Sequence, residues 1–125
     1  MGETDFSVME KKLSLSWLLD FYGEMLTENQ REMSRLHWEE DLTFAEIAEQ
    51  FSVSRQSVHD TVTRTEKQLL TLEQKLGLVH RFRTMESGLH ACRDALERVQ
   101  ATPETQKELS AARRMISQLL DQEER

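Results

Sequence analysis

The fold is decided at residues 44–63, which read FAEIAEQFSVSRQSVHDTVT. The opening of this stretch places apolar residues three and four apart, which predicts a short helix with one buried face. Ser52 and Ser54 then flank a single apolar residue, and the Ser54 hydroxyl is suited to cap a following helix that begins at Arg55. A short helix, a tight turn and a second helix together predict a helix-turn-helix unit.

The same stretch contains a small core that would fix the crossing of its two helices. Ala48 stands where the helices approach closely and a larger side chain would clash. Ser52 occupies a turn position that needs a left-handed backbone, where glycine is usual and serine costs about 1 kcal/mol. The apolar residues expected in this core are Ile47, Phe51, Val53, Val58 and Val62.

Further helices are predicted on the amino-terminal side. Helical spacing of apolar residues predicts a first helix over residues 12–26, and a capping box of Thr27 and Gln30 predicts the start of a second. Thr43 and Glu46 form another such box, at the start of the short helix of the helix-turn-helix unit. The inward face of the first helix is predicted to hold Leu15, Leu18, Leu19, Tyr22, Met25 and Leu26.

Two longer amphipathic stretches follow on the carboxyl-terminal side. The second helix of the unit is expected to continue inward through Leu69, Leu72, Leu76 and Val79. Beyond Gly77 the spacing becomes that of a heptad seam, which is typical of a helix packed on a partner helix. The seam residues are Phe82, Met85, Leu89, Cys92, Leu96 and Val99. Thr102 and Pro103 predict the start of a last helix, whose apolar stripe is Leu109, Ala112, Ile116, Leu119 and Leu120.

These carboxyl-terminal seams must be covered, and the sequence leaves two ways open. Either the two helices form a hairpin that packs on the amino-terminal helices, or they form a homodimer surface or a partner groove. The second alternative would use Leu89, Cys92, Leu96, Ile116 and Leu119. Because Cys92 lies on the apolar seam between two leucines, we expect its side chain in the core.

Length and composition favour an all-α fold with one modest core. The chain has 125 residues with only one proline and four glycines, too few turn formers for a β-sandwich or barrel. The predicted organisation is a disordered N-terminus over residues 1–11, a helix-turn-helix domain over 12–80, and a helical extension over 81–125. This extension is expected to pack on the domain or on a second subunit.

The same data predict a cytoplasmic protein. A single cysteine excludes an internal disulfide and fits a reducing compartment. No apolar run approaches the about 20 residues of a membrane span, and no secretory signal is visible. The net charge of −7 argues against non-specific coating of nucleic acid or anionic membrane.

Charge is unevenly distributed, and any anionic partner must meet the second half of the chain. Residues 1–51 carry 4 basic and 12 acidic side chains, whereas residues 52–125 carry 12 basic and 11 acidic ones. If the second helix of the unit enters a major groove, Arg55 suits guanine and Gln56 suits adenine. The candidate nucleic-acid-binding residues are Ser54, Arg55, Gln56, His59, Thr63, Arg64 and Lys67. Asp60 is unfavourable beside phosphate, and a solvated helix face is the alternative for the whole group.

Other conspicuous residues have a structural alternative as well. The acidic run of residues 39–41 could hold a metal or a basic partner, or simply solvate a loop and favour a helix start. Trp17 and Trp38 could stack on bases, but their spacing among Leu and Met is typical of packing. His90 and Cys92 point about 200° apart on a helix and cannot share one ion. No catalytic grouping, phosphate loop or metal cluster is found, so we expect no enzyme, metal or cofactor.

The segment LTENQREMSRLHWEEDLTFAEIAEQFSVSRQSVHDTVTRTEKQLLTLEQKLGLV resembles the YlxM family of small bacterial helix-turn-helix proteins. It is more distantly similar to region 4 of the primary sigma factors. The preceding LSWLLDFYGEMLT fits the opening helix of that family, so the resemblance covers roughly residues 13–80. Nothing is carried over to residues 81–125.

The resemblance implies an all-α, sigma region 4-like fold without catalytic activity. It also implies a link to the signal recognition particle pathway, because the family's genes adjoin those for the particle's GTPase and its receptor. An acidic recognition-helix residue, here Asp60, resembles a family feature and fits a DNA-binding fold used partly for protein contacts. The first hypothesis is therefore a regulatory protein that contacts protein or RNA of the particle. The alternative is a sequence-specific DNA-binding regulator, dimeric through the carboxyl-terminal helices.

Overall fold

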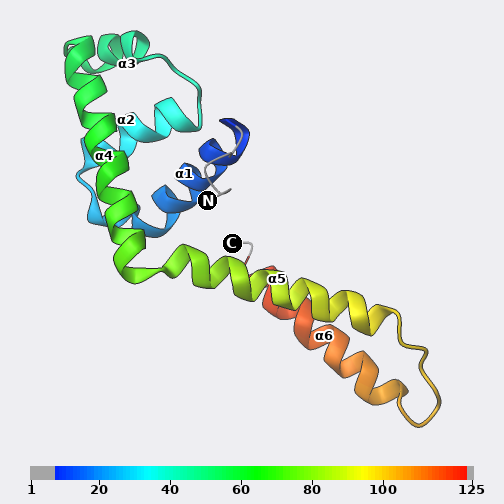
Figure 1. The fold of residues 1–125 in the computed structure, drawn as a ribbon. Helices are drawn as coiled ribbons and strands as arrows, with labels where there is room; N and C mark the ends of the chain where they lie inside the picture. Colours follow the sequence, from blue (N-terminus) through cyan, green and yellow to red (C-terminus); the bar gives the residue numbers. More distant parts are fainter. Residues whose placement is uncertain (1–7, 124–125) are drawn as a thin grey trace. The chain divides into compact units, whose positions relative to one another are not determined.

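A computed structural model describes residues 8–123, and every regular element in that range is a helix (Figure 1). The all-α fold class is therefore confirmed. The chain divides into two compact units, one ending at Val79 and one beginning at His80. The elements are α1 (Val8–Tyr22), the 3-10 turn η2 (Gly23–Met25), α2 (Glu28–Trp38), α3 (Phe44–Phe51), α4 (Arg55–Leu76), α5 (Leu78–Glu97) and α6 (Gln106–Glu123).

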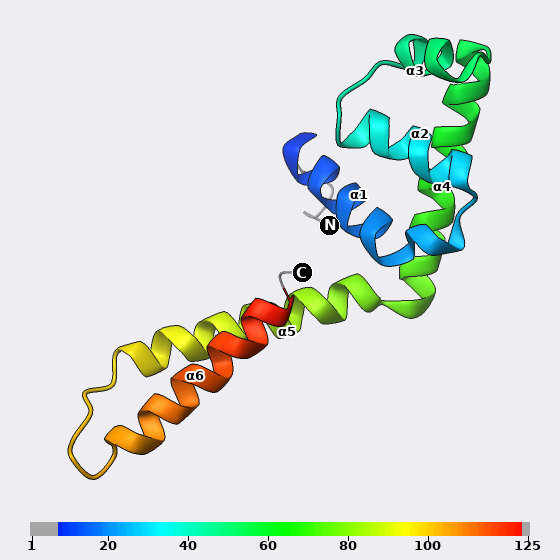
Figure 2. The ribbon, with the colours of Figure 1, turned by 180° about the vertical axis from the view of Figure 1, so that it is seen from behind.

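The first unit is built around the long helix α4. Helices α1, α2 and α3 all contact α4, and α2 also contacts both α1 and α3. Figures 1 and 2 show α1 and α2 lying against α4, with α3 at its amino-terminal end. The buried core is Leu15, Leu18, Leu19, Tyr22, Leu26, Met33, Trp38, Ile47, Ala48, Val58, Val62, Leu69 and Val79.

Three helix starts are capped as the sequence predicts. The Thr27 hydroxyl accepts from the Gln30 amide at 3.1 Å while the Gln30 side chain accepts from the Thr27 amide at 3.1 Å. Thr43 and Glu46 form the same reciprocal pair at the start of α3. The Ser54 hydroxyl accepts from the Ser57 amide at 3.0 Å and caps α4. Each cap satisfies amide groups that a helix start leaves without an intrahelical partner.

The first helix differs from its predicted bounds at both ends. It begins at Val8 rather than at residue 12, so part of the segment expected to be disordered is helical. Residues 1–7 of that segment lie outside the described residues. The α-helix ends at Tyr22, and the tighter η2 turn follows. Because a 3-10 turn changes the angular step between residues, Met25 leaves the predicted apolar face and is 59% exposed.

Some expected core residues are exposed. Val53 is 41% exposed because it follows a left-handed turn residue and lies outside both helices. Leu76 is also exposed, as the last residue of α4. Thr65, which the apolar pattern passes over, is fully buried, and its hydroxyl donates to the Thr61 carbonyl at 2.8 Å.

The junction between α4 and α5 is held by a buried tyrosine. Gly77 adopts a left-handed conformation (φ 65°) that ends α4. The Tyr22 hydroxyl donates to Glu73 Oε1 at 2.6 Å and accepts from the Leu78 amide at 3.1 Å, while the same Glu73 oxygen accepts from the Val79 amide. These bonds satisfy the first amides of α5. Burial, followed by the hydrogen bond to the Glu73 carboxylate, raises the pKa of the Tyr22 phenol.

The second unit is an antiparallel pair of helices, α5 and α6, joined by a loop (Figures 1 and 2). Arg113 of α6 donates through Nη2 to the carbonyls of Leu96 at 2.6 Å and Val99 at 3.1 Å. This guanidinium therefore binds one carbonyl in the last turn of α5 and one just beyond the helix end.

The last helix begins later than predicted. Helix α6 starts at Gln106 rather than Pro103. The preceding turn nevertheless makes the hydrogen bonds expected of a cap at Thr102. Its hydroxyl accepts from the Thr105 amide at 3.3 Å and its carbonyl from the Gln106 amide at 2.9 Å.

The heptad seam of α5 is only partly covered. Phe82, Leu89 and Leu96 form one line of the seam and are half-buried. The other line is exposed, with Met85 at 53% and Val99 at 48%. Cys92 belongs to this exposed line, so the expectation that it lies in the core is wrong. A single partner helix covers one edge of a seam and leaves the other open.

Candidate nucleic-acid interface

The candidate interface is formed by α3, the turn after it and the first turns of α4. Ser52 has φ 56° and ψ 45°, the left-handed conformation that the sequence predicts. The Val53 amide donates to the Ala48 carbonyl at 3.1 Å, and the Ser52 amide donates to the Glu49 carbonyl at 3.4 Å. This pair of bonds is the Schellman arrangement that closes a helix end. It fixes the direction in which the chain enters α4.

Small buried residues set the crossing of the two helices. Ile47 and Val58 are fully buried, and Val62 and Ala48 are nearly so. Phe51, another apolar residue of the predicted core, is half-buried and packs against it. The short helix and α4 are thereby held in the predicted helix-turn-helix crossing, with the opposite side of α4 turned outward.

All seven predicted nucleic-acid-binding residues are exposed on or beside α4. They are Ser54, Arg55, Gln56, His59, Thr63, Arg64 and Lys67. From Arg55 onward they are spaced to lie along one helix face, away from the buried line through Val58 and Val62. The hydroxyl of Ser54 is already engaged as the cap of α4. Their exposure and spacing are compatible with nucleic-acid binding, which stays a prediction.

Asp60 lies in the middle of this face and binds two of its neighbours. Gln56 Nε2 donates to Asp60 Oδ1 at 2.9 Å. His59 Nδ1 lies 3.4 Å from the same oxygen. The carboxylate therefore contacts an amide and an imidazole that the sequence predicts as nucleic-acid ligands. This role is not apparent from the pattern, which presents Asp60 only as an unfavourable charge.

An aromatic side chain from α3 supports the same group. The Phe44 ring contacts His59 edge-on, with centroids 5.4 Å apart at 87°, and lies 4.3 Å from the ring of His37. Phe44, Arg55, Gln56 and His59 together line a shallow pocket, here called the α3–α4 pocket. Sequence reasoning missed Phe44 as part of the site, because its contact with His59 joins residues on different helices.

The charge of the interface is mixed. Residues 43–67 contain 3 basic side chains (Arg55, Arg64 and Lys67) and 4 acidic ones (Glu46, Glu49, Asp60 and Glu66), a net of −1. One of the acids, Glu66, is 3.6 Å from the Lys11 ammonium of α1. Affinity for nucleic acid depends strongly on the number of phosphates that cations neutralise. The counterion-release contribution available to this face is therefore small.

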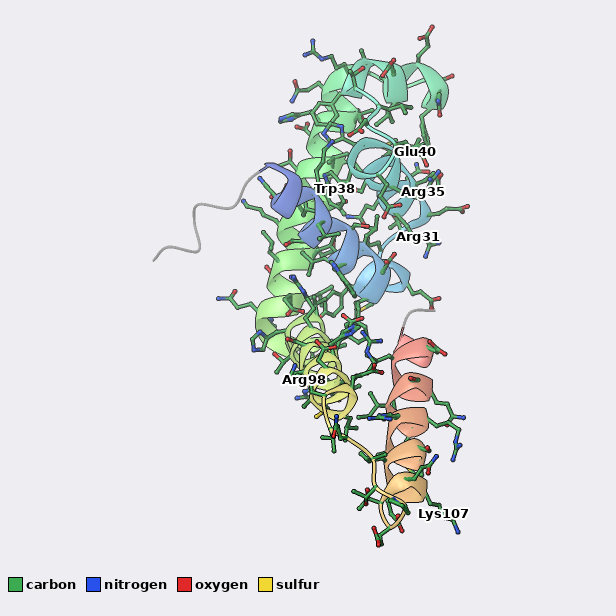
Figure 3. All side chains as sticks on the ribbon, turned by 90° about the vertical axis from the view of Figure 1, so that its right-hand side faces the viewer. Arg31, Arg35, Trp38, Glu40, Arg98 and Lys107 are labelled. Carbon is green, nitrogen blue, oxygen red and sulfur yellow. The ribbon has the colours of Figure 1, made fainter. Side chains whose placement is uncertain are left out.

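The acidic side chains of the loop before α3 contact residues of α1 and α2. Ser16 Oγ donates to Glu39 at 2.8 Å, and Lys12 pairs with Asp41. Arg35 pairs with Glu40 at 3.2 Å (Figure 3). No group of three or more potential metal ligands occurs among the residues that the structure describes. These contacts favour the structural alternative for the run.

The arginine of this loop contact also acts on a helix neighbour. Arg35 pairs with Glu32, three residues earlier on α2. The hydrogen bond from the guanidinium lowers the pKa of the Glu32 carboxyl. Arg35 thus holds two carboxylates and links α2 to the loop that precedes α3.

The two tryptophans and His90 of α5 contact neighbouring side chains of the protein. Trp38 is buried in the core, and Trp17 is half-buried with its ring 6.1 Å from Phe21. His90 Nδ1 lies 3.1 Å from Arg93 Nη2, one turn along α5.

Among the described helices, none combines the length and apolar character needed to cross a membrane.

Taken together, the left-handed turn, the two capped helices and the outward face of α4 define a helix-turn-helix protein. The chain belongs to the UPF0122 family, described as "Putative helix-turn-helix protein, YlxM / p13 like", whose family model matches residues 9–111. The resemblance to YlxM proteins is thus confirmed. The match also extends beyond residues 13–80 into α5 and α6.

Curated relatives of similar length support this assignment. A UPF0122 protein of Halalkalibacterium halodurans is 40% identical over 97 residues, covering 78% of this chain and 88% of the relative. One of Shouchella clausii is 42% identical over 94 residues, covering 75% and 86%. A UPF0122 protein of Clostridium acetobutylicum is 41% identical over 88 residues, covering 70% and 76%.

Proposed function

We propose that this chain is a non-enzymatic, cytoplasmic regulatory protein of the signal recognition particle pathway, and that it contacts protein or RNA of the particle. The resemblance to YlxM proteins supplies the link to the pathway. One structural observation carries the mode of contact. The exposed face of α4 places Asp60 among Arg55, Arg64 and Lys67, which suits a mixed-charge partner surface better than a uniform row of phosphates.

Direct binding measurements test this function. We expect the full chain to associate at micromolar concentrations with the particle's GTPase, its RNA or its receptor. Arg64→Glu should weaken that association and make it less sensitive to salt, because a favourable charge at the interface is lost. The control is Lys107→Glu, an exposed charge in the second unit, which should leave binding unchanged. Absence of association with all three components would contradict the function.

A DNA-binding regulator is the second candidate, and the helix-turn-helix crossing itself favours it. This geometry is the one that places the second helix in a major groove. In that case Arg55→Ala should weaken specific binding by about 1–3 kcal/mol, the contribution of one good base contact. Anisotropy with labelled duplex DNA at two salt concentrations is the measurement. No binding at low salt would exclude this candidate.

The DNA-binding candidate also includes a dimer through the carboxyl-terminal seam. We propose Leu89, Cys92, Leu96, Ile116 and Leu119 as its surface. In the structure Cys92 and Leu119 are exposed, whereas the other three are half-buried within the hairpin unit. A dimer would place two recognition helices on half-sites about one DNA turn apart. A strictly monomeric chain by sedimentation would exclude that geometry.

A further inference from the structure

The α3–α4 pocket brings together polar and aromatic side chains to which the proposed function assigns no ligand. It is lined by Phe44, Arg55, Gln56 and His59, and the Asp60 carboxylate contacts two of these residues. We propose that the pocket binds an unpaired nucleobase of an RNA, and that Asp60 is a positioning residue that orients Gln56 and His59 toward it. The inference rests on the RNA-binding form of the proposed function and specifies the ligand of that same face.

The polar groups of the pocket match a base edge better than a phosphate. Asp60 Oδ1 accepts a hydrogen bond from one N–H of Gln56. The second N–H and the amide oxygen of Gln56 can therefore bind a ligand. A carboxylate only accepts, so a neutral His59 ring bonded to Asp60 would carry its proton on Nδ1 and present Nε2 as an acceptor. Arg55 adds donors. Phosphate oxygens need donors alone, whereas the Watson–Crick edge of every unpaired base offers both a donor and an acceptor.

Two of the four residues that line the pocket are aromatic. Phe44 and His59 meet edge-on, and both rings border the same hollow. Sequence-specific RNA recognition uses such surfaces, because unpaired bases can leave their stack and pack on aromatic side chains. Each base stacked in this way contributes about 1–3 kcal/mol without any charge neutralisation. This source of affinity suits an interface whose net charge is close to zero.

The same arrangement disfavours a fully paired duplex. Both strands of a duplex present phosphates to a docked helix, and the exposed Asp60 carboxylate faces that approach. A paired base also stays in its stack and cannot enter a hollow. A loop or bulge of RNA can place one base in the pocket and keep most of its phosphates away from Asp60.

The test compares two RNAs on the full-length chain. One is an RNA hairpin with a 2-aminopurine in an unpaired adenine-rich loop, and the other is a fully paired RNA duplex of matched length. We expect the hairpin to bind about tenfold more tightly, within the range that one stacked base provides, with a change in 2-aminopurine fluorescence. Gln56→Ala should weaken hairpin binding about tenfold and leave duplex binding unchanged. The control, Lys67→Ala, should weaken both RNAs equally.

Asp60 provides the decisive variant, because two explanations of its role predict opposite results. If Asp60 orients Gln56 and His59, Asp60→Ala weakens hairpin binding several-fold although it removes a negative charge. Asp60→Asn, which keeps an acceptor oxygen beside Gln56, should then retain most of the binding. If Asp60 only repels RNA, both variants bind hairpin and duplex more tightly, and the inference is overturned. Circular-dichroism melting of each variant establishes that the fold is intact.

Failure of the inference is distinguishable from failure of the proposed function. If the unmodified chain binds hairpin and duplex RNA equally, or Gln56→Ala changes neither, the base pocket is wrong while RNA binding stands. Preferential binding of duplex DNA would also overturn the inference and favour the DNA-binding candidate. If the chain binds no RNA and no protein component of the particle, the proposed function itself fails.

Discussion

At the scale of single residues, Ser52 has a strained backbone conformation in the turn between α3 and α4. Its left-handed conformation (φ 56°, ψ 45°) is unfavourable for any residue with a side chain. Ser52→Gly should therefore raise the free energy of unfolding by about 0.5–1 kcal/mol, after allowance for the greater freedom of glycine in the unfolded chain. Thermal unfolding measures the change.

Gly77 provides the matched control for this prediction, because it is left-handed as well (φ 65°). Gly77→Ala meets no neighbouring atoms within 4 Å of the added carbon, so its only cost is the backbone strain. It should lower the free energy of unfolding while Ser52→Gly raises it. Two shifts of the same sign would contradict the assignment of strain to these conformations.

Tyr22 is the second residue whose chemistry has a measurable consequence. Tyr22→Phe removes both its bond to Glu73 and the acceptor of the part-buried Leu78 amide. We expect a loss of about 1–3 kcal/mol in the free energy of unfolding at neutral pH, the cost of leaving buried polar groups without partners. Urea unfolding of both proteins is the measurement. An unchanged midpoint would show that the junction does not depend on the tyrosine.

The raised pKa of Tyr22 adds a pH dependence with a defined sign. In the folded state the phenol keeps its proton above the ordinary value of 10.0, where the unfolded chain has lost it. The contribution of Tyr22 to stability is therefore complete below pH 10 and decreases as pH rises further. Since the chain has one tyrosine, an ultraviolet titration reports this group alone. Titration at the ordinary value in the folded protein would contradict the prediction.

Residues with nearby partners could be predicted from the sequence, and those with distant partners could not. The caps at Thr27, Thr43 and Ser54 bond to groups three residues away, so the local pattern contains all the information. The bond from Tyr22 to Glu73 joins positions 51 residues apart. A search for local patterns detects Tyr22 only as a member of an apolar face.

At the scale of elements, one arginine connects the two helices of the second unit. Arg113→Ala removes charge-assisted bonds to the Leu96 carbonyl of α5 and to the Val99 carbonyl just after it, each of which contributes about 1.5–3 kcal/mol. We expect hydrogen-exchange protection to fall at least about tenfold in α5 and α6 and to stay unchanged in the first unit. Arg114→Ala, the exposed neighbour, is the control. Equal effects of the two substitutions would contradict this role of Arg113.

The second unit also shows what a heptad pattern can and cannot predict. The spacing correctly indicated that α5 packs on another helix, because apolar seams at this period need a partner. It did not indicate which edge of the seam the partner covers. Leu89 is half-buried and Cys92 is exposed, although both belong to the same seam. The open edge becomes visible only when the position of α6 is known.

At the scale of the whole molecule, the distribution of buried residues predicts which part of the chain folds by itself. All members of the first unit's core cluster lie between Leu15 and Val79. A fragment that ends at Val79 should therefore keep the helix-turn-helix unit folded, with a melting temperature close to that of the full chain. A fragment that ends at Leu76 lacks the Leu78 and Val79 amides bound by Tyr22 and Glu73, and it should lose about as much stability as Tyr22→Phe.

The pair of fragments separates two explanations of the boundary near residue 80. If the carboxyl-terminal extension only adds a second surface, the 1–79 fragment melts cooperatively and the 1–76 fragment melts at a lower temperature. If the extension completes the core of the first unit, both fragments lose their cooperative transition. The first outcome follows from the burial of Leu69 and Val79 within the first unit's own core cluster, because that core then needs no residue beyond Val79. Calorimetry of the two fragments beside the full chain measures the difference directly.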